Sequence, residues 1–182
     1  MAQFIVDLVN WQEWDRAWQT ADVAEQIARH LGEDGLLAEV TFRRAIWHYR
    51  RGELVAALTT WQAAQTLFEA VDQQEGVANC LCNIGILYKD MGRTTKARSY
   101  LEHALADYEK LAYQEGQAAC LTNLGLVLRV QGDLETAVTR YQSALQLYRQ
   151  IEDKEGEAAV LGNLGLVCLG LGQFQKSLKH QE

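Results

Sequence analysis

The pentapeptide NLGLV stands at Asn123–Val127 and again at Asn163–Val167, and the near copy NIGIL stands at Asn83–Leu87. The register of 40 residues that relates them (residues 83, 123 and 163) extends well beyond these segments. Other residues that keep it include Gly76, Gly116 and Gly156, and Gly92, Gly132 and Gly172. The chain therefore contains an internal repeat, and a repeat of this length indicates stacked copies of one small structural unit.

Each copy divides into two helical patterns. The segments EGQAACLTNLGLVLRVQ (residues 115–131) and LETAVTRYQSALQLYRQI (residues 134–151) both place apolar residues three or four apart, the period of an amphipathic helix. Gly132 lies between them and is a helix stop signal. The chain has no proline and no long alternating segment typical of a β-strand. The sequence therefore predicts an all-α protein made of helix pairs.

Composition and helix length together favour a stacked architecture. A short helix pair cannot bury its own apolar face, so neighbouring pairs must supply the core, which predicts an α-solenoid of antiparallel helix pairs. Hydrophobic residues make up 48% of the chain and charged residues 23%, near globular averages. No apolar run approaches the roughly 18 residues of a membrane span, and the N-terminal FIVDLV lacks the flanks of a signal peptide. We expect a cytoplasmic protein that does not enter a membrane.

The repeated residues resemble the tetratricopeptide repeat, which sets a large residue, Leu-Gly, an aromatic and Gly on its first helix, then alanine and aromatic positions on its second. The matching residues of one copy are Leu121, Leu124-Gly125, Leu128, Gly132, Ala137, Tyr141 and Ala144. The period of 40 residues exceeds the usual value of about 34, and the proline that commonly ends the repeat is absent. In these departures the chain is similar to the long-repeat branch found in kinesin light chains, spindle-orientation scaffolds, bacterial peptide-pheromone receptors and bacterial STAND-type regulators. The resemblance implies a right-handed superhelix with a concave binding groove.

In this register, residues 1–182 form a single array. We expect a partial repeat at 1–34, a degenerate repeat at 35–74, repeats at 75–114 and 115–154, and a truncated repeat at 155–182. The degenerate copy has Arg44 and His48 at positions expected to be apolar, so its first helix could be rotated or differently packed. Both ends of the chain have the pattern of an array cut from a longer one.

Small residues are expected where the two helices of a repeat cross. Gly85, Gly125 and Gly165 would let the second helix press against the first, and Ala97, Ala137 and Ser177 would do the same from the other side. Larger side chains there would overpack the pair by about 1 to 3 kcal/mol.

By the resemblance, function lies on the concave surface that the first helices line. The residues in phase there combine amides, apolar side chains and cations, and they form the predicted peptide-binding groove: Arg43, Ile46, Asn83, Ile86, Lys89, Asn123, Leu126, Arg129, Asn163 and Leu166. An apolar stripe beside a row of amides suits an amphipathic ligand, although plain packing between first helices would need the same apolar residues.

The asparagines Asn83, Asn123 and Asn163 have two interpretations. Asparagine is a mediocre helix former, so it is not there for helix stability. Its amide offers donors and an acceptor that could bond the backbone of a bound peptide, as asparagine does at this position in related repeats. Alternatively, each amide bonds a neighbouring helix and sets the geometry of the repeat.

The charge pattern favours an acidic partner. The formal net charge is -7, yet the surface assigned as concave holds Arg43, Arg50, Lys89 and Arg129. Glu39 and Asp90 fall on the same face, so an unspecific solvated pattern is the alternative. The acidity of the chain and the absence of a basic cluster disfavour nucleic acid as a partner.

The remaining reactive residue types suggest no chemistry. Cys80, Cys82, Cys120 and Cys168 have no CxxC spacing and no nearby histidine, so we expect reduced thiols that pack in the core. The four histidines are scattered over different repeats, and no phosphate-binding, dinucleotide-binding or HExxH motif is present. We expect no catalytic residue, no cofactor and no metal site. The tryptophans Trp11, Trp14, Trp18, Trp47 and Trp61 are interpreted as core, or else as an interface with a preceding segment.

Two functions remain open at this point. In the first, the array is a non-catalytic module that binds a peptide or protein segment as the sensor or scaffold part of a larger regulatory protein. In the second, its surfaces serve contacts within the parent protein or self-assembly, with no external ligand. Because Phe174 and Leu178 would face inward without a polar cap after them, we also expect self-association through the truncated C-terminal repeat.

Overall fold

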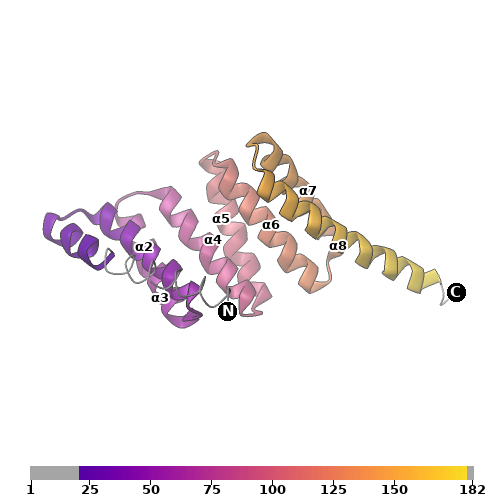
Figure 1. Ribbon diagram of the computed structural model, residues 1–182, viewed down its shortest axis with the longest axis horizontal. Helices are drawn as coiled ribbons and strands as arrows, with labels where there is room; N and C mark the ends of the chain where they lie inside the picture. Colours follow the sequence, from indigo (N-terminus) through magenta and orange to yellow (C-terminus); the bar gives the residue numbers. More distant parts are fainter. Residues whose placement is uncertain (1–20, 180–182) are drawn as a thin grey trace, which may run out of the picture. The chain divides into compact units, whose positions relative to one another are not determined.

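The computed structural model describes the backbone of residues 21–179 and the side chains of residues 21–172. Residues 21–31 are helical, and the helices that follow are α2 (Asp34–Arg50), α3 (Leu54–Ala70), α4 (Gln74–Asp90), α5 (Thr94–Lys110), α6 (Gln114–Gln131), α7 (Leu134–Gln150) and α8 (Lys154–Lys179). The all-α prediction is confirmed, and the helices pack in sequence as antiparallel pairs in the manner of a repeat solenoid (Figure 1). Trp11, Trp14 and Trp18 lie outside the described residues.

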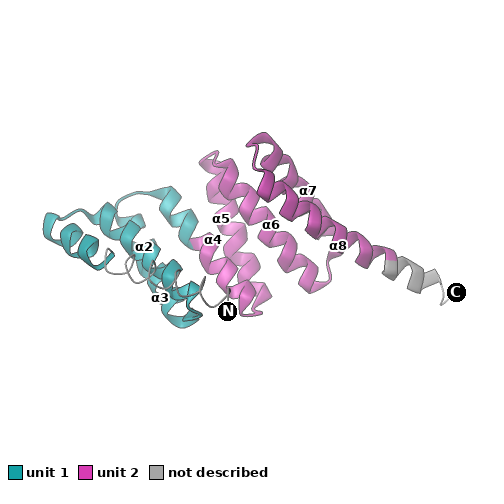
Figure 2. Cartoon of the chain, in the orientation of Figure 1, with its two compact units in different colours: residues 1–80 teal, residues 81–182 magenta. Residues whose placement is uncertain are grey.

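The chain divides into two compact units, residues 1–80 and residues 81–182, with the division inside α4 (Figure 2). Each unit is described by itself. The predicted grouping of all residues into a single array stays a prediction.

In the first unit, α2 and α3 pack against each other around alanines and large aromatic side chains. Ala45, Ala57 and Ala64 are fully buried, and Trp61 is 1% exposed. The rings of Phe42 and Phe68 meet edge to face with centroids 6.3 Å apart. The core interpretation is confirmed for Trp61.

Trp47 differs from Trp61, because it is only half-buried. The guanidinium of Arg51 lies 4.3 Å from its ring centroid, an arrangement in which the cation is attracted to the ring face.

Ion pairs explain the polar residues of the degenerate repeat. Arg44 pairs with Asp22 and Glu25 of the preceding helical segment. The Nδ1 atom of His48 lies 2.6 Å from Glu53 Oε2, and this hydrogen bond is the main reason why the pKa of the Glu53 carboxyl is lowered. Arg44 and His48 are half-buried, and their polar groups find partners on adjacent segments. That the first helix of this repeat is rotated or differently packed stays a prediction.

The turns after α2, α4 and α6 share one backbone conformation. Gly52, Gly92 and Gly132 have positive φ angles of 75°, 71° and 83°. The following N–H then donates back to the last turn of the helix, as from Arg93 to the Tyr88 carbonyl at 2.8 Å. This is the Schellman pattern of helix termination. The helix stop predicted at Gly132 is confirmed, and Gly52 and Gly92 take the same conformation.

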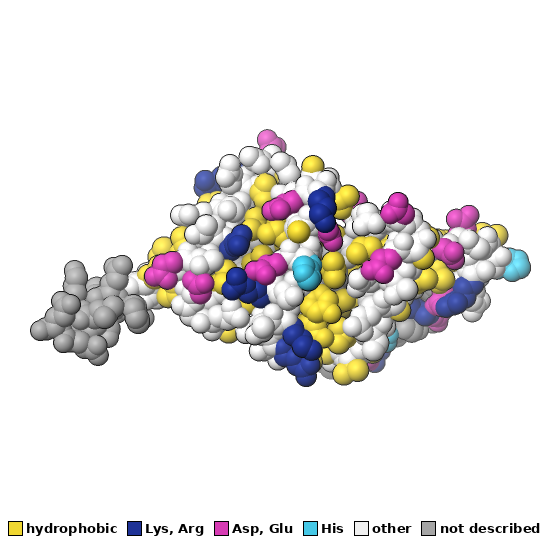
Figure 3. Space-filling view, turned by 180° about the vertical axis from the view of Figure 1, so that it is seen from behind, with side chains coloured by type: hydrophobic (Ala, Val, Ile, Leu, Met, Phe, Trp, Pro, Cys, Tyr) yellow, Lys and Arg dark blue, Asp and Glu magenta, His cyan; other side chains and the backbone are white. Residues whose placement is uncertain are grey.

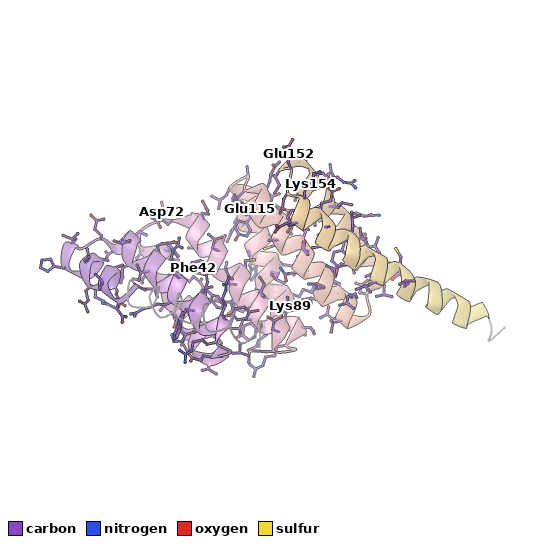
Figure 4. All side chains as sticks on the ribbon, in the orientation of Figure 1. Phe42, Asp72, Lys89, Glu115, Glu152 and Lys154 are labelled. Carbon is purple, nitrogen blue, oxygen red and sulfur yellow. The ribbon has the colours of Figure 1, made fainter. Side chains whose placement is uncertain are left out.

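The turns after α3, α5 and α7 use the same left-handed conformation without glycine. Asp72, Ala112 and Glu152 have φ angles of 56°, 53° and 58°, and Glu152 is labelled in its turn in Figure 4. Side chains rarely adopt this conformation, so the tight reversal is held by the packing of the helices on either side.

Gly172 is the exception, because it keeps the register of Gly92 and Gly132 but no helix ends there. The helix α8 continues to Lys179 as one element (Figure 1), and Gly172 does not take a positive φ. Glycine permits the left-handed conformation but does not impose it. A reversal is stabilised by the packing of the next helix. The side chains of Phe174, Ser177 and Leu178 lie outside those described.

In the second unit each helix packs on the next one: α5 on α6, α6 on α7 and α7 on α8. The C-terminal half of α4 belongs to this unit, and the rings of Tyr88 and Tyr100 join it to α5 with centroids 5.4 Å apart. Fully or nearly fully buried side chains form the core: Ile84, Leu87, Leu101, Leu124, Val127, Leu128, Tyr141, Val160 and Val167.

Glycines make the close crossings within this unit. A Cβ atom added to Gly85 would lie 2.7 Å from Leu101 Cγ, and one added to Gly125 would lie 2.5 Å from Tyr141 Cε1. Real Cβ atoms do not approach other atoms so closely. The predicted crossings at Gly85 and Gly125 are therefore confirmed.

The predicted crossing at Gly165 is wrong, since a Cβ atom there would meet nothing within 4 Å. Gly165 shares the NLGLV sequence of Gly125, but the stretch of α8 that follows does not turn back to cover it.

A second set of glycines receives aromatic rings from the preceding helix. The Tyr108 ring covers Gly116, since a Cβ atom added to this glycine would lie 2.6 Å from Tyr108 Cδ1. The Tyr148 ring covers Gly156 in the same way. Burial raises the pKa of the Tyr148 hydroxyl, partly offset by a hydrogen bond with Thr122. Consecutive helices of the unit are thus joined by large side chains seated on glycines.

These contacts predict that a glycine-to-alanine substitution changes the stability differently at Gly125 and at Gly165, which are equivalent positions of two repeats. Gly125→Ala should lower the free energy of unfolding by about 1 to 3 kcal/mol, because the added methyl group collides with the Tyr141 ring. Gly165→Ala should leave it unchanged or raise it by up to about 1 kcal/mol, because alanine is the better helix former and the space is open. Urea denaturation in dilute solution measures both, and equal effects would contradict the assigned crossings.

Candidate functional site

Most of the predicted groove residues lie in the second unit. Asn83, Ile86 and Lys89 are on α4, and Asn123, Leu126 and Arg129 are on α6, all of them half-buried. On α8, Asn163 is half-buried and Leu166 is 57% exposed. We call these residues the first-helix face.

Two contacts show that α4 and α6 lie side by side along this face. The ammonium of Lys89 donates to Asn123 Oδ1 at 2.9 Å, and the Sγ atoms of Cys82 and Cys120 are 3.4 Å apart. Helices α6 and α8 also touch. The structure therefore brings the predicted residues of α4 and α6 together, with α8 next to α6.

The contact between Lys89 and Asn123 uses both ends of the amide. While Oδ1 accepts from Lys89, Nδ2 donates to the Ala119 carbonyl of the preceding turn at 3.0 Å. The Lys89 side chain is 21% exposed and also lies 3.4 Å from Asp90 Oδ1. It is labelled near the end of α4 in Figure 4.

This geometry bears on the two interpretations of the asparagines. At Asn123 the amide bonds a neighbouring helix, as the structural interpretation requires, and it also holds a cation at the edge of the face. No hydrogen bond of the Asn163 side chain is found in the part of the chain whose side chains are described. The asparagines therefore have unlike surroundings, although they share one sequence position.

Arg129 combines a charge with an unsatisfied donor. Its Nε atom is buried without a hydrogen-bond partner, and so is the hydroxyl of Tyr141. Burial raises the pKa of the Tyr141 hydroxyl, and the nearby Arg129 guanidinium partly opposes this shift. A buried donor without an acceptor costs free energy, so this part of the face is less well satisfied than the contact between Lys89 and Asn123.

The other predicted groove residues belong to α2 in the first unit. Ile46 is half-buried. Arg43 is an exposed side chain, and its Nε donates to Glu39 Oε1 at 2.7 Å within the same helix. Its charge is therefore paired locally.

The cationic character of the face does not continue onto α8. Leu169 occupies the position that Lys89 and Arg129 hold in the preceding copies, and it is 66% exposed. The first-helix face is thus cationic and polar on α4 and α6, and apolar on α8.

The cysteines show a contact that the sequence analysis missed. Cys80, Cys82 and Cys120 are buried free thiols, as predicted, but Cys168 is exposed, so the core interpretation is wrong there. Burial raises the pKa of Cys80 to about 12. The hydrogen bond to Cys82, with burial, raises the pKa of Cys120. The spacing of 38 residues between Cys82 and Cys120, close to one repeat, was the available signal.

Other kinds of site were searched for among the described residues. There, no group of three or more His, Cys, Asp or Glu side chains is placed to hold a metal ion. None of the described helices has the length and hydropathy needed to cross a membrane. Acidic and basic side chains are interspersed over the face shown in Figure 3.

Comparison with known proteins decides the family. The model of the tetratricopeptide repeat matches residues 36–110 and 117–182. The chain belongs to the tetratricopeptide repeat family. Such repeats are protein-interaction modules and are typically not catalytic. Among proteins with curated descriptions, none matches the sequence.

Solved structures share the repeat fold at low sequence identity. BtubC (BKLC) from P. vanneervenii is similar with a TM-score of 0.66 and 18% identity, over 92% of this chain and 86% of that one. Aspartyl phosphate phosphatase F from Bacillus subtilis gives 0.72 and 14%, over 90% and 46%. The apo form of RapI gives 0.65 and 18%, over 87% and 46%. This chain spans less than half the length of the latter two.

The unlike surroundings of the asparagines generate a prediction. Asn123→Ala should lower the free energy of unfolding by about 1 kcal/mol, because the lost bond to Lys89 outweighs the better helix propensity of alanine. Asn163→Ala should instead raise it by about 0.5 kcal/mol. Denaturant titration of both variants is the measurement, and equal stabilisation by both would show that the Lys89 contact contributes nothing.

Proposed function

We propose that this array is a non-catalytic module that binds an acidic or amphipathic peptide segment of a protein partner on its first-helix face. The observation that carries the proposal is the pairing of one cation with one amide on adjacent helices, Lys89 with Asn123. In a larger regulatory protein such a module would serve as a sensor or scaffold segment, as the long-repeat resemblance implies. A cytoplasmic location fits this role.

The charges of the face support an acidic ligand. Lys89 and Arg129 are half-buried on α4 and α6, so a carboxylate bound between these helices would be screened less by water than one on an open surface. The guanidinium of Arg129 supplies the second positive charge for such a carboxylate. Ile86 and Leu126 stand beside these groups and would contact apolar side chains of the same peptide.

The asparagines would act as peptide-backbone ligands in this proposal. Asn83, Asn123 and Asn163 follow one another on α4, α6 and α8. Asn123 would exchange its bond with Lys89 for a backbone group of the ligand, and Lys89 would then be released toward a ligand carboxylate. Binding through backbone groups would tolerate many peptide sequences.

The alternative function is an array whose surfaces serve contacts within a parent protein or between copies, with no external ligand. The mutual satisfaction of Lys89 and Asn123 favours this alternative, since a ligand must first break that bond. The two functions differ in whether an added peptide is bound saturably.

The test is calorimetric titration of the chain with acidic amphipathic peptides and with the same peptides after their carboxylates are changed to amides. We expect saturable binding of the acidic set alone. Lys89→Gln and Arg129→Gln should each weaken it about 10- to 100-fold, the equivalent of one charge-assisted hydrogen bond.

Matched controls are Lys110→Gln and Lys154→Gln, which remove exposed lysines that pair with Asp107 and Glu157. These variants should bind like the unmodified chain. Absence of binding to every peptide, or equal losses in the control variants, would contradict the groove and leave the alternative function.

A further inference from the structure

The outward side of α8 is an uncovered apolar face. Between residues 158 and 172, buried or half-buried residues alternate with exposed residues at the spacing of a helix. The exposed residues are Ala158, Ala159, Leu161, Gly162, Gly165, Leu166, Cys168, Leu169 and Gly172. Leu161, Leu166 and Leu169 are 46%, 57% and 66% exposed. The opposite side of the helix is seated on α7, where Val160 and Val167 are buried.

No charge interrupts this face. Residues 158–172 contain no Asp, Glu, Lys, Arg or His, and their one strongly polar side chain, Asn163, is half-buried on the other side. A continuous exposed apolar face of this kind marks a protein contact. The lack of charge excludes recognition by ion pairs and removes repulsion between two identical surfaces.

The internal repeats show what kind of element covers such a face. The glycines in phase with Gly165 are Gly85 and Gly125, and each is covered by a large side chain of a second helix, Leu101 or Tyr141. At Gly165 the same place is open. By continuity with these crossings, the face is shaped to receive another helix at close range.

Two pairs of residues of the face are symmetric about Gly165. Leu161 and Leu169 lie four positions before and after it, and the small residues Gly162 and Cys168 lie three positions before and after it. When two copies of a helix meet antiparallel across a two-fold axis, each residue faces the one at the mirrored position. Large residues would then meet large ones and small residues small ones.

We propose that two copies of this chain associate through α8, antiparallel, with Gly165 of both copies at the crossing. Leu161 of each copy packs beside Leu169 of the other, and Gly162 lies opposite Cys168. The glycines allow the helix backbones to approach closely. This contact gives a specific arrangement for the expected self-association, and it shares Leu166 of α8 with the first-helix face.

The first experiment is sedimentation of the full chain over a range of concentrations. We expect a reversible dimer. Leu169→Glu should weaken it by roughly a hundredfold or more, because each dimer would bury two unpaired carboxylates. The matched control is Val130→Glu on α6, since Val130 is also 66% exposed but lies off this face. A monomer at every concentration, or equal effects of the two substitutions, overturns the proposal.

The second experiment tests the orientation of the two helices. Gly162→Cys introduces a thiol where there is open space. Under copper–phenanthroline oxidation, two thiols lose two protons and pass two electrons to Cu(II) as the disulfide forms. In the antiparallel dimer the introduced thiol should link to Cys168 of the other copy, and Cys168→Ser should abolish the link.

The outcomes of this second experiment are distinct. A link that persists with Cys168→Ser indicates parallel helices and overturns the proposed arrangement, as does the absence of any link. Circular dichroism confirms that each variant is folded. Peptide titration of Leu161→Glu, which should also disrupt the dimer and lies outside the first-helix face, separates this proposal from the groove, because dimer loss with unchanged peptide affinity would leave the groove standing.

Discussion

The structure depends on large side chains seated on glycines. Within the second unit, Leu101 covers Gly85, Tyr108 covers Gly116 and Tyr141 covers Gly125. Each contact sets how closely two helices approach, and the approach of successive helices decides which side chains share a face. The contact between Lys89 and Asn123 exists because α4 and α6 are brought together in this way.

This constraint also relates the two surfaces of the unit. On one side of the first helices, glycines admit the second helices and form the core. On the other side, the first-helix face presents amides, apolar residues and cations that the core does not use. Helix α8 departs from this division, because Gly165 and Leu166 are both exposed on its outward face.

Much of the fold could be predicted from the sequence, because short sequence patterns within each repeat determine where its helices begin, end and cross. Glycine stops and helical periodicity located the pairs, and the Leu-Gly position located the crossings at Gly85 and Gly125. The same pentapeptide gave a wrong prediction of a helix crossing at Gly165, because a local sequence does not show whether a later segment packs against it. The paired charges of Arg44 and the amide contact of Asn123 depend on residues in other helices, so spacing alone could not reveal them.

The most direct test of this account is a nuclear Overhauser experiment on the glycine α protons. The account predicts cross-peaks from Gly125 to the Tyr141 ring and from Gly116 to the Tyr108 ring, with upfield shifts where the rings lie over the glycines. In samples that mix labelled and unlabelled chains, the α protons of Gly165 should show cross-peaks to side chains of the other chain. Within its own chain, Gly165 should show cross-peaks to neighbouring turns of α8 alone. Absence of the Gly125 cross-peak, or contacts of Gly165 with side chains of its own chain that lie beyond α8's own turns, would contradict it.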